Sequence, residues 1–287
     1  MLGKLFVLLQ YVLPQHWLTA FVWRIARIRH PGIKDYLITR FVKLYDVDTD
    51  EVLLNVPGDF ATFNDFFIRE LKSDARRVDN AEDTMVSPVD GTVSNAGRIS
   101  AGSIVQAKGI DYPLDDLLAT DLDDARTYQS GTFATIYLAP YNYHRVHMPF
   151  DGELYAARYV PGDLFSVNEA TVASVNGLFR RNERLVMHFN TAHGTAVLIF
   201  VGALNVGSIS TPWSGELRPR KRGVVDALDI SAHATDLKKG DLLGWFNMGS
   251  TVIVLLPENT CTWSDALRPG ATLRMGDAIG TLAGAQE

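Results

Sequence analysis

The strongest constraint on the fold is a β-type pattern that occupies the chain from about residue 85 to its end. This part is rich in Val, Thr and Gly, and its short apolar runs end at Gly-Asp, Asp-Gly or Pro-Gly turns. Three runs of strand length are residues 133–138, 196–201 and 251–256. Because strands do not alternate with long helices, the pattern argues against a doubly wound parallel sheet. It predicts an α+β protein that is mainly β.

Two short internal repeats refine this prediction. PVDGTV at residues 88–93 recurs as PFDGEL at 149–154, and GDLLG at 240–244 recurs as GDAIG at 276–280. Each repeat is a turn followed by the start of a strand, and both resemble the hairpins of lipoyl-type barrel-sandwich folds. We therefore expect a duplicated barrel-sandwich-like β domain over residues 46–287. Matches this short also arise from turn chemistry alone, which is the alternative interpretation.

The first 45 residues differ from the rest of the chain in charge and in hydropathy. They carry seven Lys or Arg against one Asp, a net charge of +6, so the remaining residues carry −12 and the whole chain −6. Apolar side chains there follow helical spacing, and two arginines lie off the apolar stripe. The stripe consists of Leu18, Phe21, Val22, Ile25 and Ile28. The pattern predicts amphipathic helices over residues 1–45.

This segment fits neither a membrane-spanning helix nor a signal peptide. A span needs roughly 20 apolar residues, but Pro14 to His16 and then Arg24 and Arg27 interrupt the apolar runs. The apolar run at residues 5–9 is short for a signal peptide, and no small-residue cleavage site follows it. We expect helices in the interface of an anionic membrane, peripheral at the cytoplasmic face of the cell membrane. Packing of these helices on the domain core is the alternative.

Composition and motif content exclude several classes of protein. Cys261 is the one cysteine, so a disulfide scaffold is excluded and a reducing compartment is favoured. The chain has no phosphate loop, no dinucleotide fingerprint, no zinc-protease motif and no hydrolase elbow. His144 and His147 point to opposite faces of a predicted strand, so we expect no metal site there. With a net charge of −6, a nucleic-acid binder would need a concentrated basic patch. The first 45 residues supply such a patch, which we assign to a membrane surface, so we expect no nucleic acid as a partner.

Four motifs carry a resemblance to a known family. They are SPVDG at residues 87–91, PYNYHRVHMP at 140–149, YVPGDLFSVN at 159–168 and FNMGSTVI at 246–253. In their order and spacing they resemble the phosphatidylserine decarboxylases, and the resemblance runs over most of the chain. Members of that family commonly have Leu before the Gly-Ser pair, where this chain has Met248, an apolar residue of similar size.

The resemblance implies a proenzyme that cleaves its own chain between Gly249 and Ser250. The products would be residues 1–249 and residues 250–287, which stay together as a heterodimer. Because residues 252–256 are predicted to be a buried strand, the short fragment would remain in the sheet after cleavage. The sequence leaves open whether two such heterodimers associate into a dimer.

The family's motifs give three residues a role in this cleavage. Ser250 is the nucleophile, His147 is the base and Asp90 orients the base, since a serine hydroxyl needs such partners. Gly249 lacks a Cβ, so we expect a backbone that can be strained and a carbonyl that can be approached closely. Each residue also has a structural interpretation: Asp90 in a turn, Ser250 at a strand start and His147 in the core.

The resemblance further implies that Ser250 becomes a pyruvoyl group, a covalent cofactor made from the chain. Its ketone would form a Schiff base with phosphatidylserine and accept the electron pair released with CO2, giving phosphatidylethanolamine. His144 is the candidate for handling the substrate carboxylate or delivering a proton. Two other functions stay open: a membrane-bound scaffold that never cleaves, and a pyruvoyl enzyme that acts on a soluble amino acid.

Overall fold

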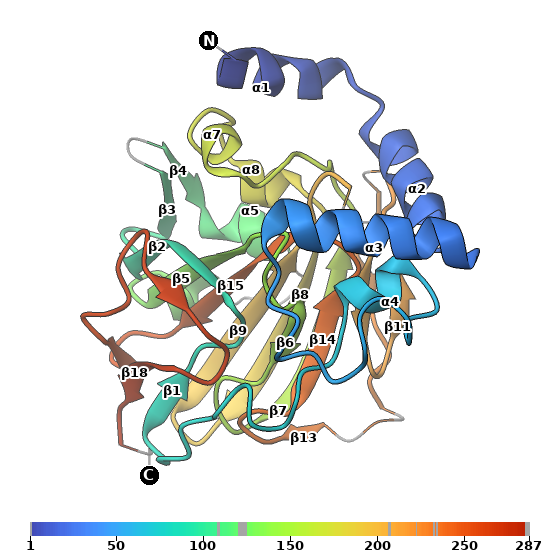
Figure 1. The fold of residues 1–287 in the computed structure, drawn as a ribbon. Coiled ribbons are helices and arrows are strands. Elements are labelled where there is room, and N and C mark those ends of the chain that lie inside the picture. The colour runs from blue at the N-terminus through green and yellow to red at the C-terminus, as the bar shows by residue number, and fades with distance from the viewer. Residues whose placement is uncertain are drawn as a thin grey trace.

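The computed structural model describes residues 2–107, 110–119, 125–205, 208–221, 223–231, 233 and 235–284. Helices from the amino-terminal part of the chain lie at one end of a body made of β-sheets (Figure 1). These helices are α1 (Leu2–Val12), α2 (Gln15–Ala26), α3 (Pro31–Tyr45) and the short α4 (Phe63–Phe67). None of the helices in the described ranges combines the length and the apolar character that crossing a membrane requires.

Local sequence explains where these helices begin. Pro14 lies directly before α2, and Pro31 is the first residue of α3, where its fixed φ suits a helix and no amide donor is lost. The Thr62 hydroxyl accepts a hydrogen bond from the Asp65 amide at 3.1 Å and caps α4. The helices predicted over residues 1–45 are therefore present as α1, α2 and α3.

The β body is built around one large antiparallel sheet. In spatial order it contains β12 (Asp226–Ala227), β7 (Gly152–Val160), β8 (Arg184–Thr191), β9 (Gly194–Val201), β15 (Ser250–Leu256), β5 (Thr132–Leu138), β2 (Gly91–Arg98) and β17 (Thr272–Leu273), and β13 (Asp236–Leu237) also pairs with β7. The central strand β15 pairs with β9 on one side and β5 on the other, and every residue of it is buried. This confirms the buried strand that the sequence predicts after the Gly-Ser pair.

Smaller sheets and short helices complete the fold. A second sheet runs in the order β11 (Gly215–Leu217), β10 (Ile209–Thr211), β14 (Leu242–Phe246) and β6 (Arg145–His147). A third runs β1 (Thr84–Val86), β18 (Ala278–Leu282) and β16 (Cys261–Trp263), and β3 (Ser103–Ala107) pairs with β4 (Ile110–Pro113). The short helices are α5 (Leu114–Leu118), α6 (Ala125–Tyr128), α7 (Glu169–Val172) and α8 (Leu178–Arg181). The protein is thus α+β and mainly β, as predicted.

The two sequence repeats have equivalent local structures. Gly240 and Gly276 have φ values of 90° and 92°, a left-handed conformation that favours glycine, in the turns before β14 and β18. The Gly240 amide donates to the Met148 carbonyl at 2.8 Å, and the Gly276 amide donates to the Ser87 carbonyl at 3.0 Å. Both turns are therefore pinned in the same way to the segment that precedes a Pro-x-Asp-Gly motif.

The aspartates of the Pro-x-Asp-Gly motifs match as well. Asp151 Oδ1 accepts from the Lys239 amide, and Asp90 Oδ1 accepts from the Met275 amide, both at 2.8 Å. The two repeats thus share these hydrogen bonds, while the duplication of the domain stays a prediction. The described strands form open sheets, so a barrel-sandwich architecture stays a prediction.

Two hydrophobic cores meet where the helices contact the sheets. The larger core fills the β body, and the smaller one lies among α2, α3 and α4, with Ile38 and Phe66 fully buried. The smaller core uses residues on both sides of Tyr45, so the proposed domain boundary there stays a prediction. Met248 packs against this smaller core. The Gly249–Ser250 junction therefore lies at the contact between helices and sheets.

Candidate active site

The Gly249–Ser250 junction lies at the start of the central strand β15. Ser250 pairs with Leu138 of β5, its side chain is fully buried, and its Oγ has no hydrogen-bond partner. A buried polar group without a partner costs roughly 1–3 kcal/mol, so such a group calls for a reason other than stability. Chemistry at the hydroxyl is one such reason.

The backbone at Gly249 is not in the left-handed region that favours glycine. The expectation that this residue permits a strained backbone stays a prediction. A Cβ added to Gly249 would meet only the Leu138 carbonyl oxygen, at 3.9 Å. Open space beside the glycine therefore characterises the junction.

A cavity of about 220 Å³ opens over this junction, and we name it the junction cavity. Its walls come from α3, α4, the end of β5, residues 166–168 and residues 203–205, with Met248 and Gly249 at the junction itself. A neighbouring cavity of about 260 Å³, the helix groove, lies between α2 and α3. Phe41 and Met248 line both cavities, and among the described residues Arg40 alone is polar on the wall of the helix groove. The two cavities are therefore neighbours that share part of one apolar wall.

His144 lies beside the junction cavity, in the turn before β6. Its ring packs on Phe67, which lines that cavity, with 4.1 Å between ring centroids. Its carbonyl accepts from the Phe246 amide at the end of β14. Nδ1 lies 2.8 Å from the Asn142 carbonyl, and because a carbonyl only accepts, Nδ1 carries the proton. Nε2 is therefore a bare acceptor, buried and without a partner.

The surroundings of His144 keep its ring neutral. Burial first, and the Arg69 cation second, lower the pKa of His144 to about 3, although its bond to the Asn142 carbonyl opposes the shift. Arg69 is fixed by the Tyr141 and Asn142 carbonyls, at 3.0 and 3.3 Å. A ring with so low a pKa is a weak base: its Nε2 can accept a hydrogen bond, but the ring offers no positive charge to a carboxylate.

His147 lies on β6 and is oriented by two neighbours. Its Nδ1 donates to the Gly240 carbonyl at 2.8 Å, and the Tyr143 hydroxyl, 3.0 Å from Nε2, therefore donates to Nε2. Burial lowers the pKa of His147, while the Gly240 carbonyl and the Asp90 charge oppose this shift. The ring is thus a neutral base whose basic nitrogen is in contact with a tyrosine hydroxyl.

Asp90 is buried and is held by an arginine rather than by His147. Arg76 Nε and Nη2 donate to its two carboxylate oxygens at 2.8 and 2.5 Å, beside the Met275 amide already described. The Asp90 charge raises the pKa of His147 electrostatically. The two segments are also joined through the backbone, where the His147 amide donates to the Pro88 carbonyl. Asp90 therefore acts on His147 here as a nearby charge.

The structure does not bring the predicted site residues together as one hydrogen-bonded set, and they fall into two groups. Asp90 and His147 form one group, and Gly249, Ser250 and His144 form the other. Within the described part of the chain, no hydrogen bond joins the Ser250 hydroxyl to either histidine. The same part contains no cluster of three or more His, Cys, Asp or Glu side chains that could hold a metal ion.

Sequence reasoning missed four residues that support these groups. They are Phe67, Arg69, Arg76 and Tyr143. Tyr143 belongs to the PYNYHRVHMP motif, so its position four residues before His147 was the available signal. No local pattern marks the other three, because their partners lie far away in the sequence.

Comparison of the chain with known proteins identifies its family. A family model described as phosphatidylserine decarboxylase matches residues 63–281, and a second, described as PSD, matches residues 5–46. The phosphatidylserine decarboxylase proenzyme of Alcanivorax borkumensis is 46% identical over 278 residues, 96% of each chain. Proteins of the same name from Psychrobacter cryohalolentis and Saccharophagus degradans are 45% and 42% identical, over 97% and 98% of this chain and 99% of each relative. The chain therefore belongs to the phosphatidylserine decarboxylase family, as its motifs predict.

Proposed function

We propose that this protein is a phosphatidylserine decarboxylase that makes its own pyruvoyl group by cleaving the bond between Gly249 and Ser250. The observation that carries the proposal is the buried, unpartnered Ser250 hydroxyl, directly after a residue that lines the junction cavity, in a chain of the decarboxylase family. A hydroxyl held away from water and without a partner is available as a nucleophile once a base takes its proton.

Cleavage proceeds by an acyl shift, an elimination and a hydrolysis. Ser250 Oγ attacks the Gly249 carbonyl carbon and the peptide C–N bond breaks, which gives an ester and a free amine on Ser250. Loss of the Ser250 α-proton then breaks the Cβ–O bond, releases the Gly249 carboxylate and leaves a dehydroalanine. The imine tautomer takes up water and loses ammonia, so residue 250 ends as a pyruvoyl group. These steps need no oxidant or reductant.

His147 is the proposed base for cleavage, with the Asp90 charge in support. Its neutral Nε2 is the accepting nitrogen, and the Tyr143 hydroxyl bonded to it can relay a proton. His144 is the second candidate, because its Nε2 is bare and its ring packs on Phe67, a residue of the junction cavity wall. Loss of the base stops cleavage, whereas loss of a residue needed only for decarboxylation leaves two inactive fragments.

The two fragments are proposed to stay together as a heterodimer. After cleavage, β15 begins the short fragment, and its neighbours β5 and β9 belong to the long one. The pairing with β5 extends along the whole of Ser250–Leu256, and the pairing with β9 covers residues 251–255. A fully buried strand with partners on both sides cannot leave without opening the core. The new end at residue 250 would therefore remain beside the junction cavity.

Decarboxylation then uses the environment around residue 250. A pyruvoyl group there would supply a ketone that binds the substrate amine and accepts the electron pair released with CO2. Apolar walls such as Phe67 and Met248 disfavour a charged carboxylate and so favour its departure as neutral CO2. His144 stays the candidate for delivering a proton to the α-carbon, because its bare Nε2 can accept a proton that is passed to it and its low pKa means that it gives this proton up easily. The product is phosphatidylethanolamine.

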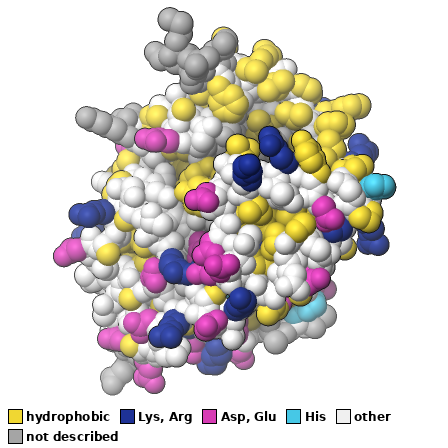
Figure 2. Space-filling view, in the orientation of Figure 1, with side chains coloured by type: hydrophobic (Ala, Val, Ile, Leu, Met, Phe, Trp, Pro, Cys, Tyr) yellow, Lys and Arg dark blue, Asp and Glu magenta, His cyan; other side chains and the backbone are white. Residues whose placement is uncertain are grey.

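The amino-terminal helices suit the surface of an anionic membrane. Their most exposed large apolar side chains are Val12, Trp17 and Leu44, at 76%, 80% and 74% exposure. Apolar side chains gather over these helices in the upper right of the space-filling view, with Lys and Arg among them (Figure 2). Exposed apolar residues insert at a lipid interface, and the net charge of +6 over residues 1–45 attracts anionic lipid. We propose a peripheral protein at the cytoplasmic face of the cell membrane.

The helix groove favours a lipid over a soluble amino acid as the substrate. It shares Phe41 and Met248 with the junction cavity, so an acyl chain can lie in the groove while the headgroup reaches residue 250. Burial of apolar surface stabilises the complex by about 25 cal/mol per Å², which a soluble amino acid could not use. The lipid headgroup is therefore the preferred source of the amine and the carboxylate.

The proposal is tested with purified protein on a denaturing gel and on vesicles that contain phosphatidylserine. The wild type should give two bands, with a blocked ketone at the start of the short fragment by mass spectrometry, and should release CO2. Ser250→Ala should give one inactive band of 31.7 kDa, whereas the exposed Ser73→Ala control should behave as wild type. A single band for the wild type would refute self-cleavage and favour a scaffold, and equal turnover of free serine would refute the lipid substrate.

A further inference from the structure

A loop that lines the junction cavity is held by side chains from distant parts of the chain. Residues 166–168 form part of the cavity wall, and we name residues 163–168 the wall loop. Its three consecutive amides, those of Leu164, Phe165 and Ser166, each donate to the oxygen of a side-chain carboxamide. A loop with this many side-chain acceptors depends on the elements that supply them.

Two of the three acceptors belong to the amino-terminal helices. Gln15 Oε1, in the first turn of α2, accepts from the Leu164 amide at 2.8 Å. Gln10 Oε1, in α1, accepts from the Ser166 amide at 2.7 Å. Both contacts join residues about 150 positions apart, which local folding of the loop cannot provide. The position of the wall loop is therefore tied to the position of α1 and α2.

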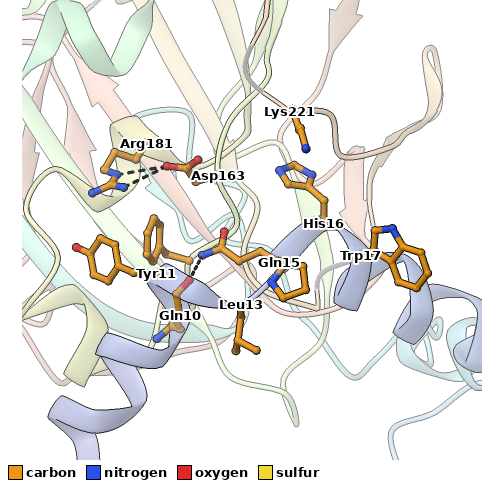
Figure 3. Close-up of a pocket in the computed structure, with 11 residues that line it drawn as sticks. Gln10, Tyr11, Leu13, Gln15, His16, Trp17, Asp163, Arg181 and Lys221 are labelled. Atoms are coloured by element: carbon orange, nitrogen blue, oxygen red, sulfur yellow. Dashed lines mark hydrogen bonds and ion pairs between the residues drawn. The ribbon is translucent and has the colours of Figure 1, made fainter.

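The two glutamines are themselves fixed by further hydrogen bonds. Gln10 and Gln15 are only 1% and 8% exposed. Gln15 Nε2 donates to the Gln10 carbonyl at 2.8 Å, a bond drawn in Figure 3, and Gln10 Nε2 donates to the Thr171 hydroxyl at 3.2 Å. Each carboxamide thus uses both its oxygen and its nitrogen, as a buried amide requires. The bonds fix the direction as well as the distance of the helices from the loop.

The third acceptor extends the network to a second segment of the cavity wall. Asn182 Oδ1 accepts from the Phe165 amide at 3.0 Å, and Asn182 Nδ2 donates to the Gly202 carbonyl at 2.9 Å. Gly202 directly precedes residues 203–205, another part of the wall of the junction cavity. Asn182 is fully buried, so this part of the network does not depend on the helices. Gln10 and Gln15 are the members that a movement of the helices would disconnect.

The same helices carry the exposed apolar surface that we assign to the membrane. Tyr11 and Trp17, which flank the turn between α1 and α2, are 51% and 80% exposed. They lie beside Gln10 and Gln15 where α1 ends and α2 begins (Figure 3). A membrane that binds the turn between α1 and α2 would therefore change the position of these helices. Their buried residues Gln10 and Gln15 hydrogen-bond the wall loop.

We propose that Gln10 and Gln15 are positioning residues that couple the docking of α1 and α2 to the shape of the junction cavity. With the helices in place, the wall loop is held closed on the substrate headgroup. When the helices move, the Leu164 and Ser166 amides lose their acceptors and the loop loosens. This inference rests on the proposed function, because it concerns how that site binds its lipid.

The test replaces each glutamine by methionine, which has a similar size but no carboxamide. All variants should self-cleave fully, since neither glutamine contacts the junction. We expect the KM for phosphatidylserine in mixed micelles to rise about fivefold for Gln10→Met or Gln15→Met, and about 25-fold for the double variant, with kcat within about twofold of wild type. The exposed Gln129→Met is the matched control and should leave both constants unchanged.

A conservative variant and an exchange measurement separate positioning from a merely structural role. Gln15→Glu keeps an acceptor for the Leu164 amide but loses the donor to the Gln10 carbonyl, so KM should rise by about twofold, less than in Gln15→Met. Hydrogen exchange of the Leu164 and Ser166 amides should accelerate in the methionine variants.

Faster exchange without a change in KM, or a loss confined to thermal stability, would overturn the inference. The single variants decide the matter if the double variant does not fold. Failure of the proposed function itself has a different signature, because wild type and Gln129→Met would then release no CO2 from phosphatidylserine.

Discussion

Replacing Arg76 by methionine should both destabilise this protein and slow its self-cleavage. The Arg76 and Asp90 side chains are 9% and 7% exposed, and two hydrogen bonds join them, so they form a buried ion pair. Removing one partner of such a pair costs about 3–5 kcal/mol, because an uncompensated charge is left behind. The Met275 amide continues to donate to Asp90, which places the expected loss at the lower end, about 3 kcal/mol.

The measurement is best made in the uncleaved Ser250→Ala background, so that one intact chain unfolds. Urea unfolding should show the loss directly, and the melting temperature should fall by on the order of 10 °C. Arg76→Met combined with Asp90→Asn should recover most of the stability, because no unpaired charge remains. Arg77→Met is the matched control, since Arg77 is exposed.

In the cleavable chain, Arg76→Met should slow the appearance of the two fragments on a denaturing gel. The reason is that Asp90 would no longer be held near His147, whose protonation it influences. A stability loss below about 1 kcal/mol would show that the pair is not the buried ion pair described here. An unchanged cleavage rate would remove Asp90 from the proposed mechanism.

Three further changes test the site and its surroundings. His147→Gln should prevent cleavage, whereas His144→Gln should give both fragments on a gel but lower decarboxylation at least about 100-fold; the reverse pattern would exchange the two roles. Burial raises the pKa of Glu183 to about 7, so between about pH 4.5 and 7 the native state keeps a proton that the unfolded state has released, and stability falls as the pH rises. Glu183→Gln should therefore raise the free energy of unfolding at pH 8 by up to about 3 kcal/mol and have little effect at pH 4. Thermal melts at both pH values measure this, with the exposed Glu153→Gln as the control. A stability change that is the same at both pH values would contradict the prediction. Gly249→Ala should fold with a stability within about 1 kcal/mol of wild type by urea unfolding, because a Cβ there meets only one carbonyl oxygen, at 3.9 Å; a larger loss would mean that the space beside the glycine is filled.

Several elements could be predicted because they depend on neighbours in the chain. The apolar run at residues 251–256 predicts a strand, and β15 spans Ser250–Leu256. Pro14 and Pro31 mark the starts of α2 and α3 for reasons that lie in the proline ring. The motifs identify the family, and with it the candidate residues, without any knowledge of the fold.

Only the tertiary structure decided which side chains meet. The sequence offers Asp90 as a partner for His147, yet the folded chain gives its carboxylate to Arg76. Gln15 interrupts an apolar run in the sequence, but in the fold it is buried and accepts from the Leu164 amide. Periodicity and turn chemistry are local and can be seen in the order of residues. Burial and hydrogen-bond partners arise when helices and sheets pack together, and no local pattern records which groups that packing brings within reach.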